Sequence, residues 1–209
     1  MKQISEKVIQ GLIDIKAISI NLETPFIWAS GIKSPIYCDN RKSIGHYELR
    51  STIAQGLSEA IKTNYPDVEL IGGTATAGIP HATSVADNMQ LPLVYFRSKP
   101  KDHGTGSVIE GDYQKSQKIV IIEDLISTGG SVLQCVDYAK AAGLEVLGVV
   151  AIFSYELEVA VKNFAAANIS ITSLTGFNDL YEVLNLETSA RGFINLWRKN
   201  VKDSSIWEK

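Results

Sequence analysis

Residues 120–132, VIIEDLISTGGSV, join an apolar run to groups that can bind a sugar phosphate. Ionised Glu123 and Asp124 only accept hydrogen bonds, which suits the vicinal hydroxyls of a ribose and a hydrated Mg²⁺. The Ser, Thr and Gly residues of 127–131 then open an expected helix, whose unpaired N–H groups and positive end attract phosphate. Simple helix capping needs one polar residue, whereas six of the eight residues 124–131 are polar or glycine. The segment therefore predicts a site for a ribose 5-phosphate.

This segment resembles the motif by which type I phosphoribosyltransferases bind phosphoribosyl pyrophosphate (PRPP). The shared features are an apolar strand, two acids, two intervening residues and a Thr/Gly-rich loop. The resemblance implies that the acids contact the ribose hydroxyls, that Asp124 is catalytic and that the loop holds the 5-phosphate. The PRPP-binding residues implied here are Glu123, Asp124, Leu125, Ile126, Ser127, Thr128, Gly129, Gly130 and Ser131. Ser127 also occupies the position that contacts the base in the family.

A second group of candidate residues lies in the polar loop 97–117. A loop of this length inside a compact domain is more often functional or disordered, although a solvated charged loop is the simpler alternative. Its cations would stabilise a departing pyrophosphate. FRSKPKDHGTG resembles the catalytic loop of orotate phosphoribosyltransferases, which implies that Arg97, Lys101 and His103 bind PRPP, the latter two as catalytic residues. It also implies a homodimer in which residues 97–106 reach the neighbouring site.

Two further segments carry the same resemblance. Residues 26–41, FIWASGIKSPIYCDNR, resemble the hood that covers the base in the family, and we expect residues 18–42 to contribute it. Some relatives have Lys where Ala29 occurs here, so the resemblance favours an aromatic and backbone contact with the base. Residues 74–80, TATAGIP, resemble the loop that holds pyrophosphate through backbone groups. Arg41 could line the hood, and a solvated surface position has at least equal weight.

The elements that must position these residues follow from the spacing of apolar side chains. Continuous apolar runs such as 119–122 are typical of strands covered on both faces, and their alternation with helical patterns indicates parallel βαβ units. Strands are expected at 68–73, 92–96, 118–124, 145–153 and 169–174, with helices at 3–17, 46–63, 78–88, 129–142, 156–167 and 189–201 and a hairpin at 26–40. The prediction is one α/β domain, residues 1–209, with an open, doubly wound, mainly parallel sheet and a small N-terminal hood, as in the type I phosphoribosyltransferase fold. Ligands of such sheets bind at the carboxyl ends of the strands.

Composition narrows the function classes. The formal net charge of -3 and the sequence pI of about 5.7 argue against a nucleic-acid binder. Cys38 and Cys135 lack the spacing of a zinc site or a disulfide framework. No uncharged apolar run reaches the length of a membrane span. We therefore expect a soluble, cytoplasmic protein with no membrane or nucleic-acid partner.

The resemblance implies transfer of the 5-phosphoribosyl group from PRPP to orotate, giving orotidine 5′-phosphate and pyrophosphate in pyrimidine biosynthesis. Mg²⁺ is the implied cofactor, carried by PRPP or pyrophosphate with no direct protein ligand. Three alternatives remain open at this point: a phosphoribosyltransferase for another base, a PRPP-sensing regulator, and an α/β domain of another role.

Overall fold

A six-stranded sheet forms the centre of the fold. The computed structural model describes residues 2–28, 30–98 and 108–208. The sheet order is β10-β9-β8-β5-β6-β7, and all neighbours are parallel except β6 and β7. The strands are β5 (Leu70–Thr74), β6 (Leu93–Phe96), β7 (Ile109–Glu110), β8 (Lys118–Ile126), β9 (Glu145–Ser154) and β10 (Ile171–Thr175). The predicted α/β fold with a mainly parallel sheet is confirmed.

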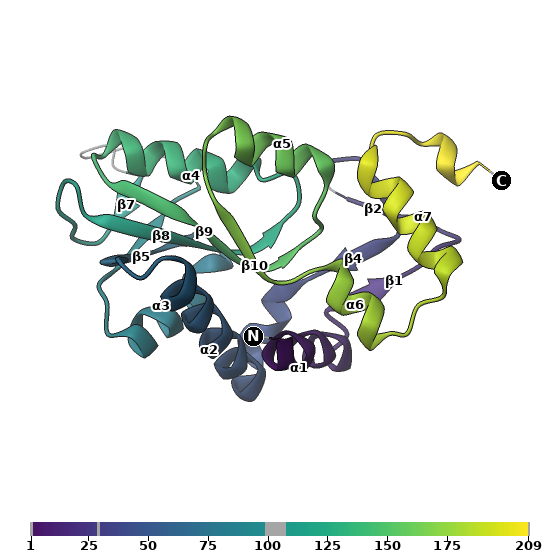
Figure 1. Cartoon of the computed structure of the whole chain (residues 1–209), viewed down its shortest axis with the longest axis horizontal. Helices are drawn as coiled ribbons and strands as arrows, with labels where there is room; N and C mark the ends of the chain where they lie inside the picture. Colours follow the sequence, from purple (N-terminus) through teal and green to yellow (C-terminus); the bar gives the residue numbers. More distant parts are fainter. Residues whose placement is uncertain (1, 29, 99–107, 209) are drawn as a thin grey trace.

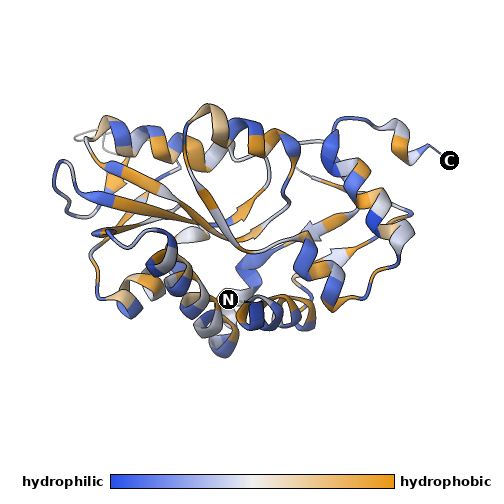
Figure 2. Cartoon of the chain, viewed as in Figure 1, coloured by the Kyte–Doolittle hydropathy of each residue, from blue (hydrophilic) through white to orange (hydrophobic). Residues whose placement is uncertain are grey.

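Helices cover both faces of this sheet (Figure 1). On one face lie α1 (Lys2–Asp14), α2 (Tyr47–Asn64) and α3 (Gly78–Met89); on the other lie α4 (Gly130–Ala141) and α5 (Glu158–Ala166). The strands between them are the most apolar part of the molecule (Figure 2), and residues 119–122 and 149–153 are fully buried. A strand covered on both sides has no polar face, which is why these runs do not alternate.

The direction of winding reverses between β5 and β8. From β5 the chain passes through α3 to β6 on one side, whereas from β8 it passes through α4 to β9 on the other. The loops that leave two such strands diverge and leave a crevice at their carboxyl ends, which is the usual binding position in open α/β sheets.

A smaller layer, built mainly from the N-terminal region, lies beside this crevice. Strand β1 (Ile18–Ile20) pairs antiparallel with β4 (Ile36–Cys38), and β2 (Phe26–Ile27) pairs with β3 (Lys33–Ser34), so the predicted hairpin is confirmed. The chain then enters the 3-10 helix η1 (Asn40–Gly45). We call residues 18–42 the hood.

The C-terminal helices lie against the same hood (Figure 1). They are α6 (Phe177–Val183) and α7 (Thr188–Lys199), followed by η2 (Ser205–Trp207). Trp197 of α7 is fully buried, and its indole Nε1–H donates to the Lys33 carbonyl at 2.8 Å. The expected C-terminal helix is thus present, and it binds β3 although the two elements are far apart in the sequence.

Several predicted boundaries were wrong for local reasons. The first helix ends at Asp14 rather than 17, because Lys16 takes a positive φ of 55° and redirects the chain into β1. The strand that begins at 118 runs past the acids to Ile126, because β9 continues to pair with it up to Ser154. In the predicted helix 156–167, the face marked by Ala160 and Phe164 packs on the core, whereas the apolar Val161 is 62% exposed. The two-residue strand β7 and the helix α6 were not predicted.

Within the residues that the structure describes, no helix combines the length and the apolar character needed to cross a membrane.

Candidate active site

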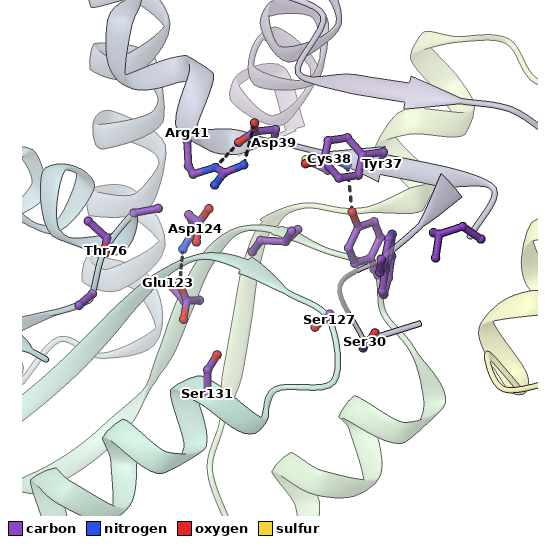
Figure 3. Close-up of a pocket in the computed structure, with 16 residues that line it drawn as sticks. Ser30, Tyr37, Cys38, Asp39, Arg41, Thr76, Glu123, Asp124, Ser127 and Ser131 are labelled. Atoms are coloured by element: carbon purple, nitrogen blue, oxygen red, sulfur yellow. Dashed lines mark hydrogen bonds and ion pairs between the residues drawn. The ribbon is translucent and has the colours of Figure 1, made fainter. Parts of the chain in front are cut away.

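A cavity of about 720 Å³ occupies the crevice between the hood and the carboxyl ends of β5 and β8 (Figure 3). Four parts of the chain that are distant in sequence contribute to it. The lining residues are Ile27, Trp28, Ser30, Tyr37, Cys38, Asp39, Arg41, Ala75, Thr76, Ala77, Glu123, Asp124, Leu125, Ser127, Ser131 and Tyr155. The segment singled out first from the sequence therefore shares one cavity with the hood and with the β5–α3 loop.

The acid pair lies on the last part of β8, inside the strand. Glu123 is 7% exposed and Asp124 is half-buried, and the Asp124 backbone N–H donates to Glu123 Oε1 at 2.9 Å. Burial raises the pKa of Glu123 well above the usual carboxyl range, and a hydrogen bond and the charge of Asp124 raise it further. The pair therefore resists holding two negative charges.

The loop 127–131 is shaped by a tight turn into α4. Gly129 has a φ of 80°, and a Cβ atom built there would lie 2.6 Å from Phe164 Cε2, so only glycine suits this position. From α5, Asn163 Nδ2 donates to the Thr128 carbonyl at 2.9 Å. This turn brings the first N–H groups of α4 to the edge of the cavity.

The structure separates the segment 125–131 into exposed and supporting residues. Leu125, Ser127 and Ser131 line the cavity, with Ser131 pointing toward it from the start of α4 (Figure 3). Ile126 is buried at 1% exposure and packs into the core instead. Thr128, Gly129 and Gly130 of the intervening turn are not among the lining residues.

The hood contributes aromatic rings and an ion pair. The ring centroids of Trp28 and Tyr155 are 4.6 Å apart, and both rings line the cavity. Arg41 Nε and Nη2 donate to the two oxygens of Asp39 at 2.6 and 3.0 Å. This hydrogen-bonded guanidinium lowers the pKa of Asp39 below its ordinary value.

Both alternatives for Arg41 describe part of what the structure shows. Arg41 lines the cavity near Asp124 (Figure 3), and its side chain is still 65% exposed. Trp28 packs on Tyr155 and also lines the cavity. Asp39 was not selected, and its position two residues before Arg41 is the signal that a bidentate pair can form.

The β5–α3 loop forms the wall opposite the hood. Ala75, Thr76 and Ala77 line the cavity, and the peptide bond between Ala75 and Thr76 is cis. Thr74, the last residue of β5, is 3% exposed and donates from Oγ1 to the Ile122 carbonyl at 3.2 Å. The loop therefore presents main-chain groups and small side chains, which suits the backbone contacts that its resemblance implies.

Arg97 lies next to the main cavity and does not line it. Its Nη1 pairs with Glu110 Oε1 at 3.3 Å. It lines a smaller cavity of about 100 Å³ that shares Ala75, Glu123 and Ser131 with the large one. Lys101, His103 and Ala29, which sequence reasoning also named, lie outside the described residues.

The segment that follows β9, next to Tyr155, receives an arginine from a distant helix. Arg198 of α7 makes an ion pair with Glu156 at 2.9 Å and lies 5.1 Å from the centroid of the Phe177 ring. Arg198 is not among the residues that line the cavity. Its visible role is to fasten α7 to the segment that follows β9.

Comparison with known proteins identifies the family of this chain. The family model described as phosphoribosyl transferase domain matches residues 48–178. Proteins named orotate phosphoribosyltransferase from Lactococcus lactis and Streptococcus mutans are each 49% identical over 207 residues, covering 98% of this chain and 99% of theirs. The crystal structure of orotate phosphoribosyltransferase from Aeropyrum pernix has a TM-score of 0.75 and 26% identity, covering 85% of this chain and 98% of that one. Near-complete coverage at this identity, together with the fold and its acid-bearing strand, means that the chain belongs to the orotate phosphoribosyltransferase family.

Proposed function

We propose that this chain transfers the 5-phosphoribosyl group of PRPP to orotate, releasing pyrophosphate and forming orotidine 5′-phosphate. One observation carries the proposal. The acid pair Glu123–Asp124 lines one cavity together with Ser127 and Ser131 of the helix-opening loop, in a chain whose full-length relatives bear the name orotate phosphoribosyltransferase. Acceptors for ribose hydroxyls therefore lie next to donors for a phosphate.

We assign the parts of the substrates by chemistry. The 5-phosphate suits residues 127–131, where the N-terminus of α4 offers N–H groups and the hydroxyls of Ser127 and Ser131 add donors. The ribose hydroxyls suit Glu123 and Asp124. The hood's aromatic side then receives the flat base, and Ser127, which lines the same cavity, would donate to an oxygen of orotate.

The reaction joins a ring nitrogen of orotate to C1 of the ribose as the bond from C1 to the pyrophosphate oxygen breaks. Positive charge develops on the sugar and negative charge on the leaving group. The acid pair would stabilise the first, and Arg97 with Lys101 and His103 the second. Orotate is already an anion at neutral pH, so no strong protein base is required.

Mg²⁺ is proposed as the cofactor, brought by PRPP. The donor chemistry fits a hydrated ion, because Glu123 and Asp124 present carboxyl oxygens to the cavity that can accept hydrogen bonds from metal-bound water. Among the described residues there is no group of three or more His, Cys, Asp or Glu able to hold a metal, which fits an ion whose ligands are substrate oxygens and water. Bound there, Mg²⁺ would neutralise charge on the pyrophosphate.

Two further properties, the oligomeric state and the location, complete the proposal. We propose a homodimer in which residues 97–106 reach the partner's site, following the family's catalytic loop. We also propose a cytoplasmic location, consistent with two free, buried cysteines. Sedimentation of the purified chain and mixing of two inactive variants would test the shared-site dimer.

The direct test is the change in orotate ultraviolet absorbance on adding PRPP and Mg²⁺. Consumption of orotate that requires both additions supports the proposal. Consumption of hypoxanthine but not orotate would identify a transferase for another base. PRPP binding without turnover of any base, combined with a gel shift at stated salt, would instead support a regulator.

A further inference from the structure

Strand β8 extends beyond the end of β5 at the cavity. On the side where β5 no longer pairs with β8, side chains donate hydrogen bonds to the β8 carbonyls. Pairing between the two strands ends at Gly73 and Ile122. Carbonyls two residues apart point to the same side of a strand, so those of Ile122 and Asp124 both face the position that β5 vacates. Thr74 Oγ1 donates to the Ile122 carbonyl at 3.2 Å, and Asn40 Nδ2 donates to the Asp124 carbonyl at 2.6 Å.

Asn40 is built into this position. It is fully buried, as the first residue of η1, and its backbone carbonyl accepts from Ser43 Oγ at 2.6 Å. Its Oδ1 accepts from the Cys38 thiol at 3.2 Å. The Asp124 carbonyl can only accept, so the amide nitrogen must face it and the oxygen must face Cys38. The side chain has one orientation that satisfies both neighbours.

We propose that Asn40 is a positioning residue for phosphoribosyl transfer, one that sets the acid pair by holding the main chain of Asp124. Asn40 does not line the cavity, so it acts through Asp124 rather than on substrate. Its bond is a direct link between the hood, which carries the base side of the site, and the strand that carries the ribose side. This inference rests on the proposed function.

The bond has a local energetic reason. A carbonyl that loses its donor inside the protein is costly, and the part-buried Asp124 carbonyl lies beyond the end of the β5 pairing, so that strand offers no replacement for Asn40. Without the amide donor, residues 123–125 would shift to find another partner, and the carboxylates would move with them. A displacement of about 1 Å near reacting groups can lower a rate by about a hundredfold. The effect should therefore fall on steps that use PRPP.

The test replaces the amide without changing its size. Asn40→Asp removes the donor and places an acceptor against the Asp124 carbonyl. We expect kcat/KM for PRPP to fall by about tenfold to a hundredfold, while KM for orotate changes less than threefold. Stabilisation of the folded protein by PRPP in a thermal-shift assay should shrink in parallel.

Two controls separate positioning from general support. Asn64→Asp removes the same kind of bond, from Asn64 Nδ2 to the Ala60 carbonyl at 2.8 Å, at the end of α2 that leads to the amino end of β5. Ser43→Ala removes the bond to the backbone of Asn40 and the 3.4 Å contact between Ser43 Oγ and His81 Nε2, and leaves the Asp124 contact. Both should lower the melting temperature with kcat/KM for PRPP within about twofold of the parent. If Asn40→Asp does not fold, Asn40→Ser, uncharged and too short to reach Asp124, is measured in its place.

The outcomes distinguish this inference from the proposed function. A parent chain that does not consume orotate overturns the proposed function before any variant is made. A parent that is active, with an Asn40 variant that keeps its kcat/KM for PRPP, overturns the positioning role alone. An equal fall in kcat/KM for the Ser43 variant would mean that η1 supports the site as a whole, which also overturns a specific role for Asn40.

Discussion

The indole of Trp28 and the phenol ring of Tyr155 lie 4.6 Å apart between centroids, at an interplanar angle of 35°, on the hood side of the cavity. A third ring holds this pair, since Trp197 contacts Trp28 edge-on at 5.7 Å. The residues come from the first, middle and last parts of the chain. The wall assigned to the base thus depends on α7, which contributes no lining residue of its own.

Trp197→Phe tests this dependence. The variant keeps an aromatic ring but leaves the Lys33 carbonyl without its donor, which should cost about 1 kcal/mol of unfolding free energy. Because the hood is loosened, we expect KM for orotate to rise about fivefold, the ratio that corresponds to about 1 kcal/mol. Denaturant unfolding and steady-state kinetics measure the two effects.

Trp207→Phe is the matched control for that change. Its indole Nε1 is buried and has no hydrogen-bond partner among the described residues, so the substitution removes no bond. The ring still packs edge-on against Phe193, at 5.0 Å. Both stability and KM should stay close to the parent. Equal effects of the two substitutions would mean that the bond to Lys33 does not position the hood.

Gly129→Ala tests the shape of the phosphate loop. The residue has a φ of 80° and its new Cβ would meet the Phe164 ring, so the turn must move or remain strained by about 1–3 kcal/mol. We expect PRPP to bind about tenfold more weakly or worse. Gly192→Ala is the control, because that helical glycine has open space around it and should tolerate or gain from alanine. PRPP affinity unchanged in the Gly129 variant would argue against the loop as the phosphate site.

His81 should make the folded protein sensitive to acid. The ring is fully buried, and burial, aided by Arg50, lowers its pKa from 6.5 to about 4. The unfolded chain therefore binds the proton more readily than the folded protein does. The contribution of His81 to folding stability is fully present above pH 6.5 and is lost as the pH falls toward 4. The loss from this group is about 3 kcal/mol. His81→Gln should show a flatter profile over this window than the parent; an identical slope would contradict the assignment.

Glu123 should act in the opposite sense. Its pKa is raised above the ordinary 4.5, so the folded state holds the proton more readily than the unfolded chain does. The stability that this provides is present below pH 4.5 and declines as pH rises toward the raised value, by up to ~1.4 kcal/mol per unit. Glu123→Gln should therefore be increasingly more stable than the parent at higher pH while losing turnover. A stability difference that does not change with pH would show that the carboxyl has an ordinary pKa.

Sequence patterns predicted those parts of the protein that are determined by residues close together in the chain. The continuous apolar runs gave the buried strands, because such strands must be covered on both faces. Glu123, Asp124 and Ser127 are close in sequence and remain together in one cavity. The hairpin was visible from its turn residues.

Contacts between distant segments had no such signal. Nothing in the order of residues places Trp197 against Lys33, or Asn40 beneath Asp124, because both contacts depend on how finished elements pack. The extension of β8 to Ile126 likewise depends on a partner strand, β9. Arg41 had a local signal in Asp39, but its direction toward the cavity comes from η1 packing beside β8.

The most direct test of the account is a crystal structure of this chain with PRPP and Mg²⁺ bound. We expect the ribose hydroxyls to contact Glu123 and Asp124, and the 5-phosphate to lie among residues 127–131 at the start of α4. PRPP bound at another place, with that segment making no contact to it, would contradict the central claim.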